Sequence, residues 1–354
     1  MAKTNDLTVP APARPFPLRG RWPGRGRVAL AAGLAALLLL PVAAQATGNG
    51  FYVDLAARIL IFALAAASLD LILGYGGMVS FGFAAFLGVG AYTVGILAWH
   101  VADGSPVVTW PLVLHGTENA LVVWPLAMLF GALSALVIGL VGLRTTGIHF
   151  IMITLALAQM LFYLAVSLRA YGGEDGITLY ARSRLGGLDL FDPATFYYVC
   201  LALLLAFLWI GRRLMDSRFG LVLQGCRDNE RRMRALGFPT ARYRLAAFVI
   251  AGSFGALAGA LLANATAFVG PAYMSWQRSG ELIVMTVLGG MGSLVGPVFG
   301  AAAYLLLEEV LADWTEHWQV ILGPVLLLVV LFARSGLWGW IAGRETDHGE
   351  KDHG

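Results

Sequence analysis

The chain has 354 residues, of which 58% are hydrophobic and 13% are charged, with a formal net charge of +3 and a mean hydropathy of +0.75. This balance excludes an ordinary soluble domain and indicates a polytopic α-helical membrane protein. The long apolar runs also exclude a transmembrane β-barrel, whose short strands alternate apolar and polar residues.

The first 27 residues form a basic tail with six Lys or Arg side chains against the single acidic residue Asp6. An apolar run, 28–46, follows and ends in Ala-Gln-Ala, as the cleaved signal peptides of secreted proteins do. Because this run is long enough to cross a bilayer and the downstream chain is itself apolar, we favour a retained first span with its basic tail in the cytoplasm.

Apolar runs further along predict spans at 52–74, 79–99, 121–142, 148–168, 194–211 and 244–267, a long segment at 281–311, and a last span at 319–335. The expected fold is all-α, with about eight full transmembrane helices plus broken or re-entrant glycine-rich segments. The transmembrane domain covers 28–341, and a polar tail follows at 342–354.

Charge on the connections predicts the orientation of these spans. The loop 212–244 holds nine arginines against three carboxylates, so we place it in the cytoplasm. Counting from this loop puts the neutral or slightly acidic connections 100–120, 169–193 and 268–280 outside. Both termini then lie in the cytoplasm, as the basic N-terminal tail requires.

Two glycine-rich apolar segments resemble each other. The run Gly76-Gly77-Met78-Val79-Ser80 corresponds to Gly289-Gly290-Met291-Gly292-Ser293, and each copy is followed by a Gly-Ala pair and a tyrosine, which relates 71–92 to 288–304. Paired glycine-interrupted segments in two halves of a membrane protein indicate a transport pathway. The candidate pathway residues are Asp70, Gly76, Gly77, Ser80, Phe83, Gly289, Gly290 and Ser293.

The segment 281–311 is too long for one straight span, because 31 residues of helix measure about 46 Å against a hydrocarbon core of about 30 Å. Its central glycines and Pro297 predict two half-helices that form a re-entrant hairpin from the outside. Glycines at a spacing of four predict faces for close helix approach, with close packing favoured over a substrate role. These are Gly255 and Gly259 in one set, and Gly292, Gly296 and Gly300 in the other.

Asp70 lies deep in a predicted span, where insertion scales assign a carboxylate a cost of about 2.5–3.5 kcal/mol. We expect it to face a partner, the cavity or a subunit interface, or to be a satisfied structural group. Asp54 and Arg58 lie one helical turn apart at a span start and are expected to pair with each other.

Within the cytoplasmic loop, a short helix is predicted to begin near Asp228, with Asp228 or Asn229 as its cap and Glu230 in its first turn, and to end at Gly237. The surrounding arginines suit a docking surface for another protein, although a solvated basic loop that only fixes topology is the simpler alternative. The candidate residues of this surface are Arg227, Asp228, Asn229, Glu230, Arg234 and Gly237.

At these residues the chain resembles the inner-membrane permease subunits of branched-chain amino acid ABC importers, a group that also includes urea and short-chain amide permeases. The resemblance covers about residues 50–340 and rests on five motifs. They are the two glycine-rich segments, the Arg227-Asp228-Asn229-Glu230 run with 235–238, 244–248 and 258–261, the segment 143–148 with Thr154-Leu155, and the segment 172–176. Family members commonly carry His where this chain has Phe83 and Asn where it has Asp70, so these two positions leave the solute open.

The resemblance implies a bacterial inner-membrane importer in which this chain pairs with a second homologous permease subunit. Two cytoplasmic ABC ATPases and an extracytoplasmic solute-binding protein complete it, and membrane lipid surrounds it. The loop 212–244 would couple the permease to the ATPases. We expect no cofactor, metal or catalytic residue in this chain, because ATP binds to the partner subunits and the sequence has no phosphate-binding Gly-x4-Gly-Lys motif. No feature predicts nucleic-acid binding.

Three alternatives stay open. A permease for urea, amides or sugars shares the glycine-rich pattern, but a sugar pathway is expected to carry more Asn, Gln and aromatic residues. A self-sufficient ion-coupled secondary transporter needs ionisable groups deep in several spans, and Asp70 is the clear case, with Glu308 and Glu309 near a span end. A membrane enzyme is disfavoured, since no cluster of His, Cys or carboxylates falls on one face of adjacent spans.

Overall fold

Six helices among the described residues of the computed structural model are long and apolar enough to cross a membrane. They are α2 (Phe51–Asp70), which continues as the π-helix η1 (Leu71–Tyr75), then α3 (Ala84–Asp103), α4 (Ala120–Gly142), α5 (Ile148–Ser167), α6 (Pro193–Met215) and α8 (Thr240–Thr266). The structure describes residues 33, 35, 37–41, 50–108, 114–179, 182–186, 190–314, 317, 320–321, 323–324 and 336–341.

Four further helices among the described residues do not meet this criterion of length and apolar composition. α7 (Arg218–Ala235) precedes α8, α9 (Trp276–Gly289) and α10 (Gly296–Trp314) follow it, and α12 (Gly336–Ile341) comes last. Short 3₁₀ turns, η2 (Arg169–Tyr171) and η3 (Pro271–Met274), interrupt the connections. Two antiparallel pairs complete the fold: β1 (Pro106–Val108) with β2 (Leu114–His115), and β3 (Ile177–Thr178) with β4 (Phe268–Val269).

The expectation of an all-α polytopic membrane protein is confirmed, and six predicted spans correspond to six helices. The predicted first span, 28–46, and last span, 319–335, fall largely outside the described residues. The prediction for 79–99 was wrong at its start, because residues 76–83 are not helical and α3 begins only at Ala84.

Local sequence explains where several helices begin. The side chains of Asn119, Asp192, Ser217 and Ser275 each accept a hydrogen bond from a backbone amide in the first turn of α4, α6, α7 and α9. These residues satisfy amides that have no partner within the helix. Short polar side chains therefore cap four helix starts.

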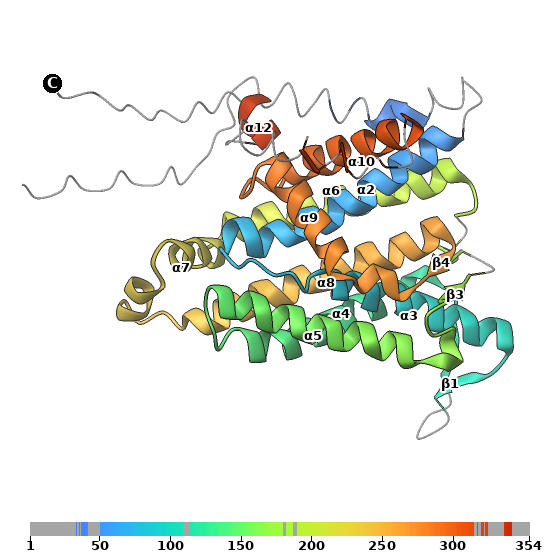
Figure 1. The fold of residues 1–354 in the computed structure, drawn as a ribbon, viewed down its shortest axis with the longest axis horizontal. Helices are drawn as coiled ribbons and strands as arrows, with labels where there is room; N and C mark the ends of the chain where they lie inside the picture. Colours follow the sequence, from blue (N-terminus) through green and yellow to red (C-terminus); the bar gives the residue numbers. More distant parts are fainter. Residues whose placement is uncertain are drawn as a thin grey trace, which may run out of the picture.

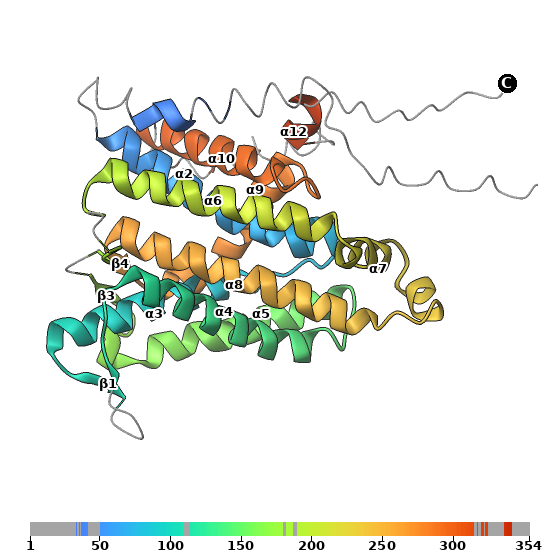
Figure 2. The same ribbon diagram turned by 180° about the vertical axis from the view of Figure 1, so that it is seen from behind.

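Helix α8 lies at the centre of the bundle and packs against α2, α3 and α4 (Figures 1 and 2). Close contact with α3 depends on small residues. A Cβ added at Gly259 would collide with the Leu87 carbonyl, and one added at Gly90 would collide with that of Ala256. Gly255 faces the Phe83 ring. The two helix backbones approach at these positions, as the predicted packing role of Gly255 and Gly259 requires.

The second set of spaced glycines behaves differently. Gly296 and Gly300 lie on α10 and face α9, where an added Cβ at Gly300 would meet the Met285 carbonyl. Gly292 does not belong to this helix face, so that prediction was wrong: it lies in the turn before α10 with φ +76°. Its lack of a side chain serves the turn, because this left-handed conformation favours glycine.

Opposite ends of the bundle carry different structures. Helix α7 projects from one end, and the two small sheets lie at the other (Figure 1). The arginine-rich loop and the described parts of the predicted outside connections 100–120, 169–193 and 268–280 are thus separated along the helix axes. This separation agrees with the orientation that the charges predict.

Candidate functional site

The first glycine-rich segment breaks the chain between two helices. The π-helix η1 closes with a hydrogen bond from the Met78 amide to the Ile72 carbonyl (2.8 Å), and Gly77 adopts φ +64°. Residues 76–83 then continue without helix until Ala84. Figure 1 shows this stretch as a thin coil running between the end of α2 and the start of α3. The predicted break is confirmed, and π-helical turns of this kind often mark functional positions.

The second glycine-rich segment forms the turn of a helical hairpin. Helix α9 ends at Gly289, α10 begins at Gly296, and the two helices pack against each other. Ser293 orders the turn, because its hydroxyl donates to the Gly290 carbonyl (2.8 Å) and accepts from the Gly296 amide (2.9 Å). The prediction of two half-helices meeting at a break is confirmed, with 290–295 as the turn.

Asp70 joins these two breaks. Its Oδ1 accepts a hydrogen bond from the Gly292 amide (2.7 Å) and its Oδ2 accepts one from the Leu294 amide (3.1 Å), and the residue is fully buried. Of the alternatives for this carboxylate, the structure therefore supports a satisfied structural group. The backbone of the hairpin turn lies on the side that the two carboxylate oxygens face.

The other candidate pathway residues divide into two groups. Gly77 contacts the Arg227 side chain, and Gly289 packs on the backbone of Gly296, so both lie at the junction of the two breaks. Ser80 and Phe83 lie elsewhere in the packed interior. Ser80 Oγ accepts from the Gly82 amide (3.3 Å), and the buried Phe83 ring packs edge-on against Phe86. Both of these side chains are buried.

The start of α3 carries a contact that sequence reasoning missed. The Ala84 amide donates to Ser279 Oγ of α9 (2.9 Å), and both residues are buried. A helix that starts inside the bundle exposes amides that need acceptors, and Ser279 supplies one. A serine near the start of an apolar segment was a visible signal, but its partner lies 195 residues away.

A group of charged side chains also escaped the sequence prediction. Arg58 of α2 pairs with Glu308 of α10 (3.4 Å) and joins these two helices, while Arg278 pairs with Glu281 within α9. The predicted Asp54–Arg58 pair was wrong, because Arg58 instead reaches across to α10. Both guanidinium groups lie over the Phe62 ring, at 5.9 Å for Arg58 and 5.4 Å for Arg278. Paired charges of this kind hold helices together in an apolar environment.

Helix α7 contains the short helix predicted to begin near Asp228, preceded by a helical stretch from Arg218 that sequence reasoning missed. The helix is kinked at Asn229 (φ −158°, ψ 94°), whose side chain accepts from the Arg232 amide (2.9 Å). Asn229 is thus the cap of the second half, as predicted. This half ends at Ala235, and Gly237, which adopts φ +88°, lies in the turn just beyond it. The predicted helix start near Asp228 was therefore correct for the second half of α7, whereas the whole helix starts at Arg218.

Glu230 holds the second half of α7 against the start of α8. Its carboxylate bonds to Arg234 (2.6 Å) and, from the start of α8, to Arg244 (3.0 Å), with Thr240 donating at 3.3 Å. Burial alone would raise the pKa of Glu230, but Arg244 and then Arg234 outweigh it and place the pKa below its ordinary value. The carboxylate is therefore ionised at neutral pH and fixes the fold of this loop.

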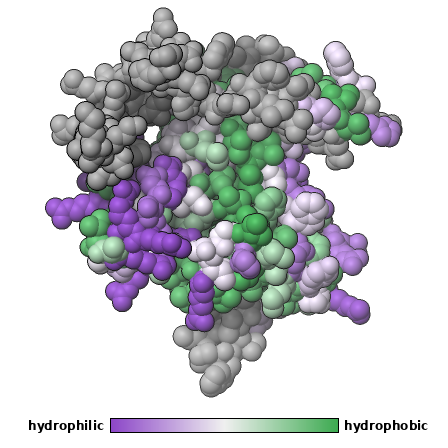
Figure 3. Space-filling model, turned by 60° about the vertical axis from the view of Figure 1, so that its left-hand side comes forward, coloured by the Kyte–Doolittle hydropathy of each residue, from purple (hydrophilic) through white to green (hydrophobic). Residues whose placement is uncertain are grey.

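Beyond this network, the tip of α7 is open. Arg231 and Arg232 are exposed, and so are the apolar side chains Leu236 (66%) and Phe238 (38%). Figure 3, turned to bring the α7 end forward, shows hydrophilic side chains gathered on one part of the surface beside hydrophobic ones. Large apolar side chains among exposed arginines are typical of a protein-binding surface.

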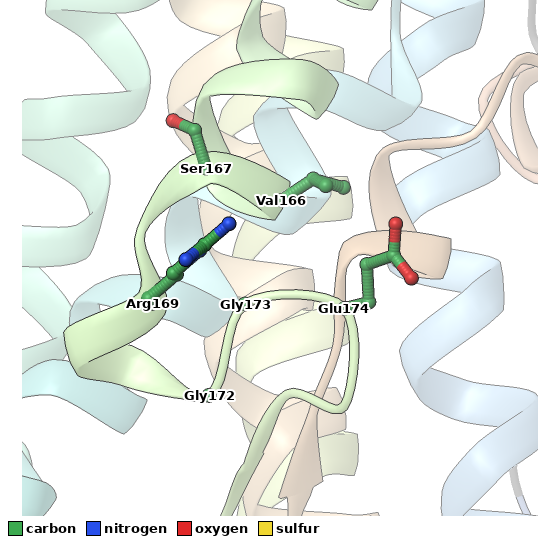
Figure 4. Close-up of a pocket in the computed structure, with 6 residues that line it drawn as sticks. All are labelled: Val166, Ser167, Arg169, Gly172, Gly173 and Glu174. Atoms are coloured by element: carbon green, nitrogen blue, oxygen red, sulfur yellow. The ribbon is translucent and has the colours of Figure 1, made fainter.

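The opposite end of the bundle carries a shallow pocket between the end of α5 and the glycine-rich loop after it. Val166, Ser167, Arg169, Gly172, Gly173 and Glu174 line it. Figure 4 shows the side chains of Arg169 and Glu174 rising on either side of Gly173. Positive φ at Gly172, Gly173 and Gly176 shapes the loop. This pocket is far along the bundle from α7 and presents both charge signs.

Comparisons with known proteins identify relatives of this chain. A family model described as branched-chain amino acid transport system / permease component matches residues 51–331. The high-affinity branched-chain amino acid transport permease LivM of Escherichia coli is 27% identical over 328 residues, which cover 86% of this chain and 74% of that protein.

More distant relatives widen the comparison. A probable LivM of Methanocaldococcus jannaschii is 25% identical over 79% of this chain and 89% of its own length. The autoinducer 2 import permease LsrC of Yersinia pseudotuberculosis is 28% identical over 56% of this chain and 60% of that protein. No solved structure matches the chain.

Proposed function

Because the chain belongs to the branched-chain amino acid transport permease family, we propose that it forms the translocation pathway of an ATP-driven importer together with a second, homologous permease subunit. The solute is proposed to be leucine, isoleucine, valine or another hydrophobic amino acid. The LivM relatives support this choice, and so does an apolar interior in which Phe83 is one of the buried side chains.

The observation that carries the proposal is the shape of α7. It is a kinked helix at one end of the bundle, fixed by the Glu230 network and bearing exposed Leu236 and Phe238. We assign this tip to a cytoplasmic ATPase, which would bind the ATP that drives import. The N-terminal tail, α7 and the C-terminal tail would share the cytoplasmic side of the bacterial inner membrane. The extracytoplasmic solute-binding protein would dock at the opposite end, around Arg169 and Glu174.

Import would proceed by alternating access. ATP-driven movement of the ATPases would shift α7, and the two glycine-rich breaks would open the pathway to one side at a time. Unwound backbone amides at these breaks can meet an amino acid carboxylate without a fixed positive charge. Asp70 takes no solute contact in this scheme, since its oxygens bind the hairpin turn.

The test is co-purification of the ATPase with a tagged permease expressed with its neighbouring genes. Leu236→Glu places a charge in the apolar part of the docking tip, and we expect it to reduce recovery of the ATPase at least about tenfold. Leu236→Met keeps the apolar surface and should retain recovery. A wild-type permease that purifies alone and moves leucine down an ion gradient in liposomes would overturn the proposal in favour of a secondary transporter.

A second solute class is suggested by the LsrC relative. Its match is shorter, yet that protein belongs to an import system for a different solute, autoinducer 2. Binding of leucine or of autoinducer 2 by the neighbouring solute-binding protein, measured by calorimetry, distinguishes the two. The first outcome supports the amino acid assignment, and the second replaces the solute while leaving the importer in place.

A further inference from the structure

We propose that Arg227 is a positioning residue of the transport cycle, which transmits movement of α7 through Gly74 and Asp70 to the hairpin turn 290–295. The inference rests on the proposed function and assigns Arg227 a role distinct from ATPase docking. Sequence reasoning grouped Arg227 with the docking residues. The structure instead directs its guanidinium toward the membrane-embedded bundle.

The first step is the contact of Arg227 with the first glycine-rich break. Arg227 Nη1 donates to the Gly74 carbonyl at 2.6 Å, although the residues are 153 positions apart. The aliphatic part of Arg227 covers Gly77, where an added Cβ would lie 2.6 Å from Arg227 Cγ. One side chain of α7 therefore contacts both η1 and a glycine just beyond its end. A charged donor to a backbone carbonyl is among the stronger hydrogen bonds.

The second step joins this point to the hairpin turn. A Cβ added at Gly74 would collide with Asp70 Oδ1 and with the Gly292 amide, so Gly74 separates Arg227 from both. Asp70 in turn accepts from the Gly292 and Leu294 amides. Three segments, α7, η1 and the turn 290–295, thus meet around one glycine without space between them.

Close packing allows this junction to transmit movement of α7 to the hairpin turn 290–295. Packed interiors shift between discrete arrangements and do not deform continuously, so displacement of α7 must either move Gly74 or break its bond to Arg227. Because Asp70 connects η1 to the turn by two hydrogen bonds, movement of η1 moves the turn as well. The two charged residues therefore have different structural roles. Glu230 holds the tip of α7 against α8, and Arg227 links the bundle-facing side of α7 to η1.

The experiment uses the complete importer in proteoliposomes. Arg227→Gln removes the charge and shortens the donor, Arg227→Lys keeps a cationic donor, and Arg218→Gln is a matched charge deletion at the exposed start of α7. We expect Arg227→Gln to retain the ATPase on purification within twofold but to lower leucine uptake per ATP hydrolysed at least tenfold. Arg227→Lys should recover part of the uptake, and Arg218→Gln should match wild type.

A second readout follows the hairpin turn directly and needs no solute. Met291 lies in this turn and is 55% exposed, so Met291→Cys reports on the turn by its rate of maleimide labelling when Cys200 and Cys226 are replaced. With Arg227 present, trapping the ATPases with ATP and vanadate should change the rate at least threefold. With Arg227→Gln in the assembled complex, the rate should not respond.

The outcomes separate the inference from the proposed function. An Arg227→Gln complex that transports like wild type, or whose turn still responds to nucleotide, overturns the transmitting role. Loss of ATPase association in Arg227→Gln, as expected for Leu236→Glu, also overturns it, because Arg227 would then be a docking residue. Failure of the wild-type chain to associate with any ATPase contradicts the importer assignment itself.

Discussion

Asp70 and Arg227 both bind one backbone junction: the carboxylate accepts from the amides of Gly292 and Leu294, and the guanidinium donates to the carbonyl of Gly74. The junction fixes the end of the first broken segment to the turn of the second. It gives the buried carboxylate a defined structural task. A change at either residue is therefore expected to reach both broken segments.

Replacement of Asp70 is expected to loosen the hairpin turn. Asp70→Asn offers one carbonyl oxygen where two carboxylate oxygens accept amides, so one amide is left unpaired at a cost of about 1–3 kcal/mol. Asp70→Ala leaves both unpaired and should cost more. The measurement is the midpoint of thermal unfolding in detergent, with Ser68→Ala as a buried control on the same helix. An Asp70→Ala variant as stable as wild type would contradict the assignment.

Neutralising Glu230 is expected to loosen the second half of α7 from α8. Glu230→Gln weakens the bonds to Arg234 and Arg244, and charged hydrogen bonds of this kind contribute about 1.5–3 kcal/mol each before solvent exposure reduces them. Limited proteolysis should cut the 228–240 segment several times faster than in wild type. Asp216→Asn is the control, because its contact with Arg212 is long (3.8 Å) and exposed. Equal cleavage of Glu230→Gln and the control would argue against the network.

The same network predicts a pH dependence. The pKa of Glu230 in the folded protein lies below its ordinary value of 4.5, so the folded state favours the ionised form. Its stabilisation is fully present above about pH 4.5 and is lost as pH falls through the lower folded pKa. Protease resistance of α7 should therefore stay constant from pH 7 to pH 5 and decline below that range. A decline centred near pH 6 would implicate another group.

Cys226 is expected to react slowly with alkylating reagents. Burial, with a further contribution from the Glu230 charge, raises the pKa of the thiol above its ordinary value of 9.0, so little thiolate is present at pH 7. In a Cys200→Ala background, iodoacetamide labelling should be at least tenfold slower than in denatured protein. Glu230→Gln removes one charge that disfavours the thiolate, and labelling should accelerate. Native-state labelling as fast as in denaturant would show that the thiol is accessible and ionised.

Small residues at the crossing of α3 and α8 should tolerate no added methyl group. Gly259→Ala places a Cβ against the Leu87 carbonyl, and overpacking of this kind costs about 1–3 kcal/mol or more. Gly280→Ala is the matched control on α9, since nothing lies within 4 Å of the added Cβ. Yield of monodisperse protein on gel filtration should fall for Gly259→Ala and hold for Gly280→Ala. Equal yields would mean that the helices can separate at no cost.

Much of the fold follows from local signals in the sequence. Hydropathy predicts six observed spans, the glycines of 74–77 and 289–292 predict the breaks, and Asn229 is recognisable as a cap. The site could be predicted only in part, because its decisive contacts join distant residues. Arg58 lies 250 positions from Glu308, and a pairing one turn away with Asp54 is equally allowed by spacing. The inward direction of Arg227 likewise depends on how α7 packs against η1.

The hydrogen bond between Ala84 and Ser279 has a consequence for how the chain inserts into the membrane, because Ser279 is synthesised much later than Ala84. The start of α3 depends on Ser279, which leaves the ribosome 195 residues later, and the unwound stretch 76–83 has no helix of its own to satisfy its backbone in lipid. During synthesis this stretch must wait in the protected environment of the insertion machinery, or near water, until α8 and α9 arrive. Biogenesis of this permease therefore has a late step in which the interior of an early segment is completed by the C-terminal third.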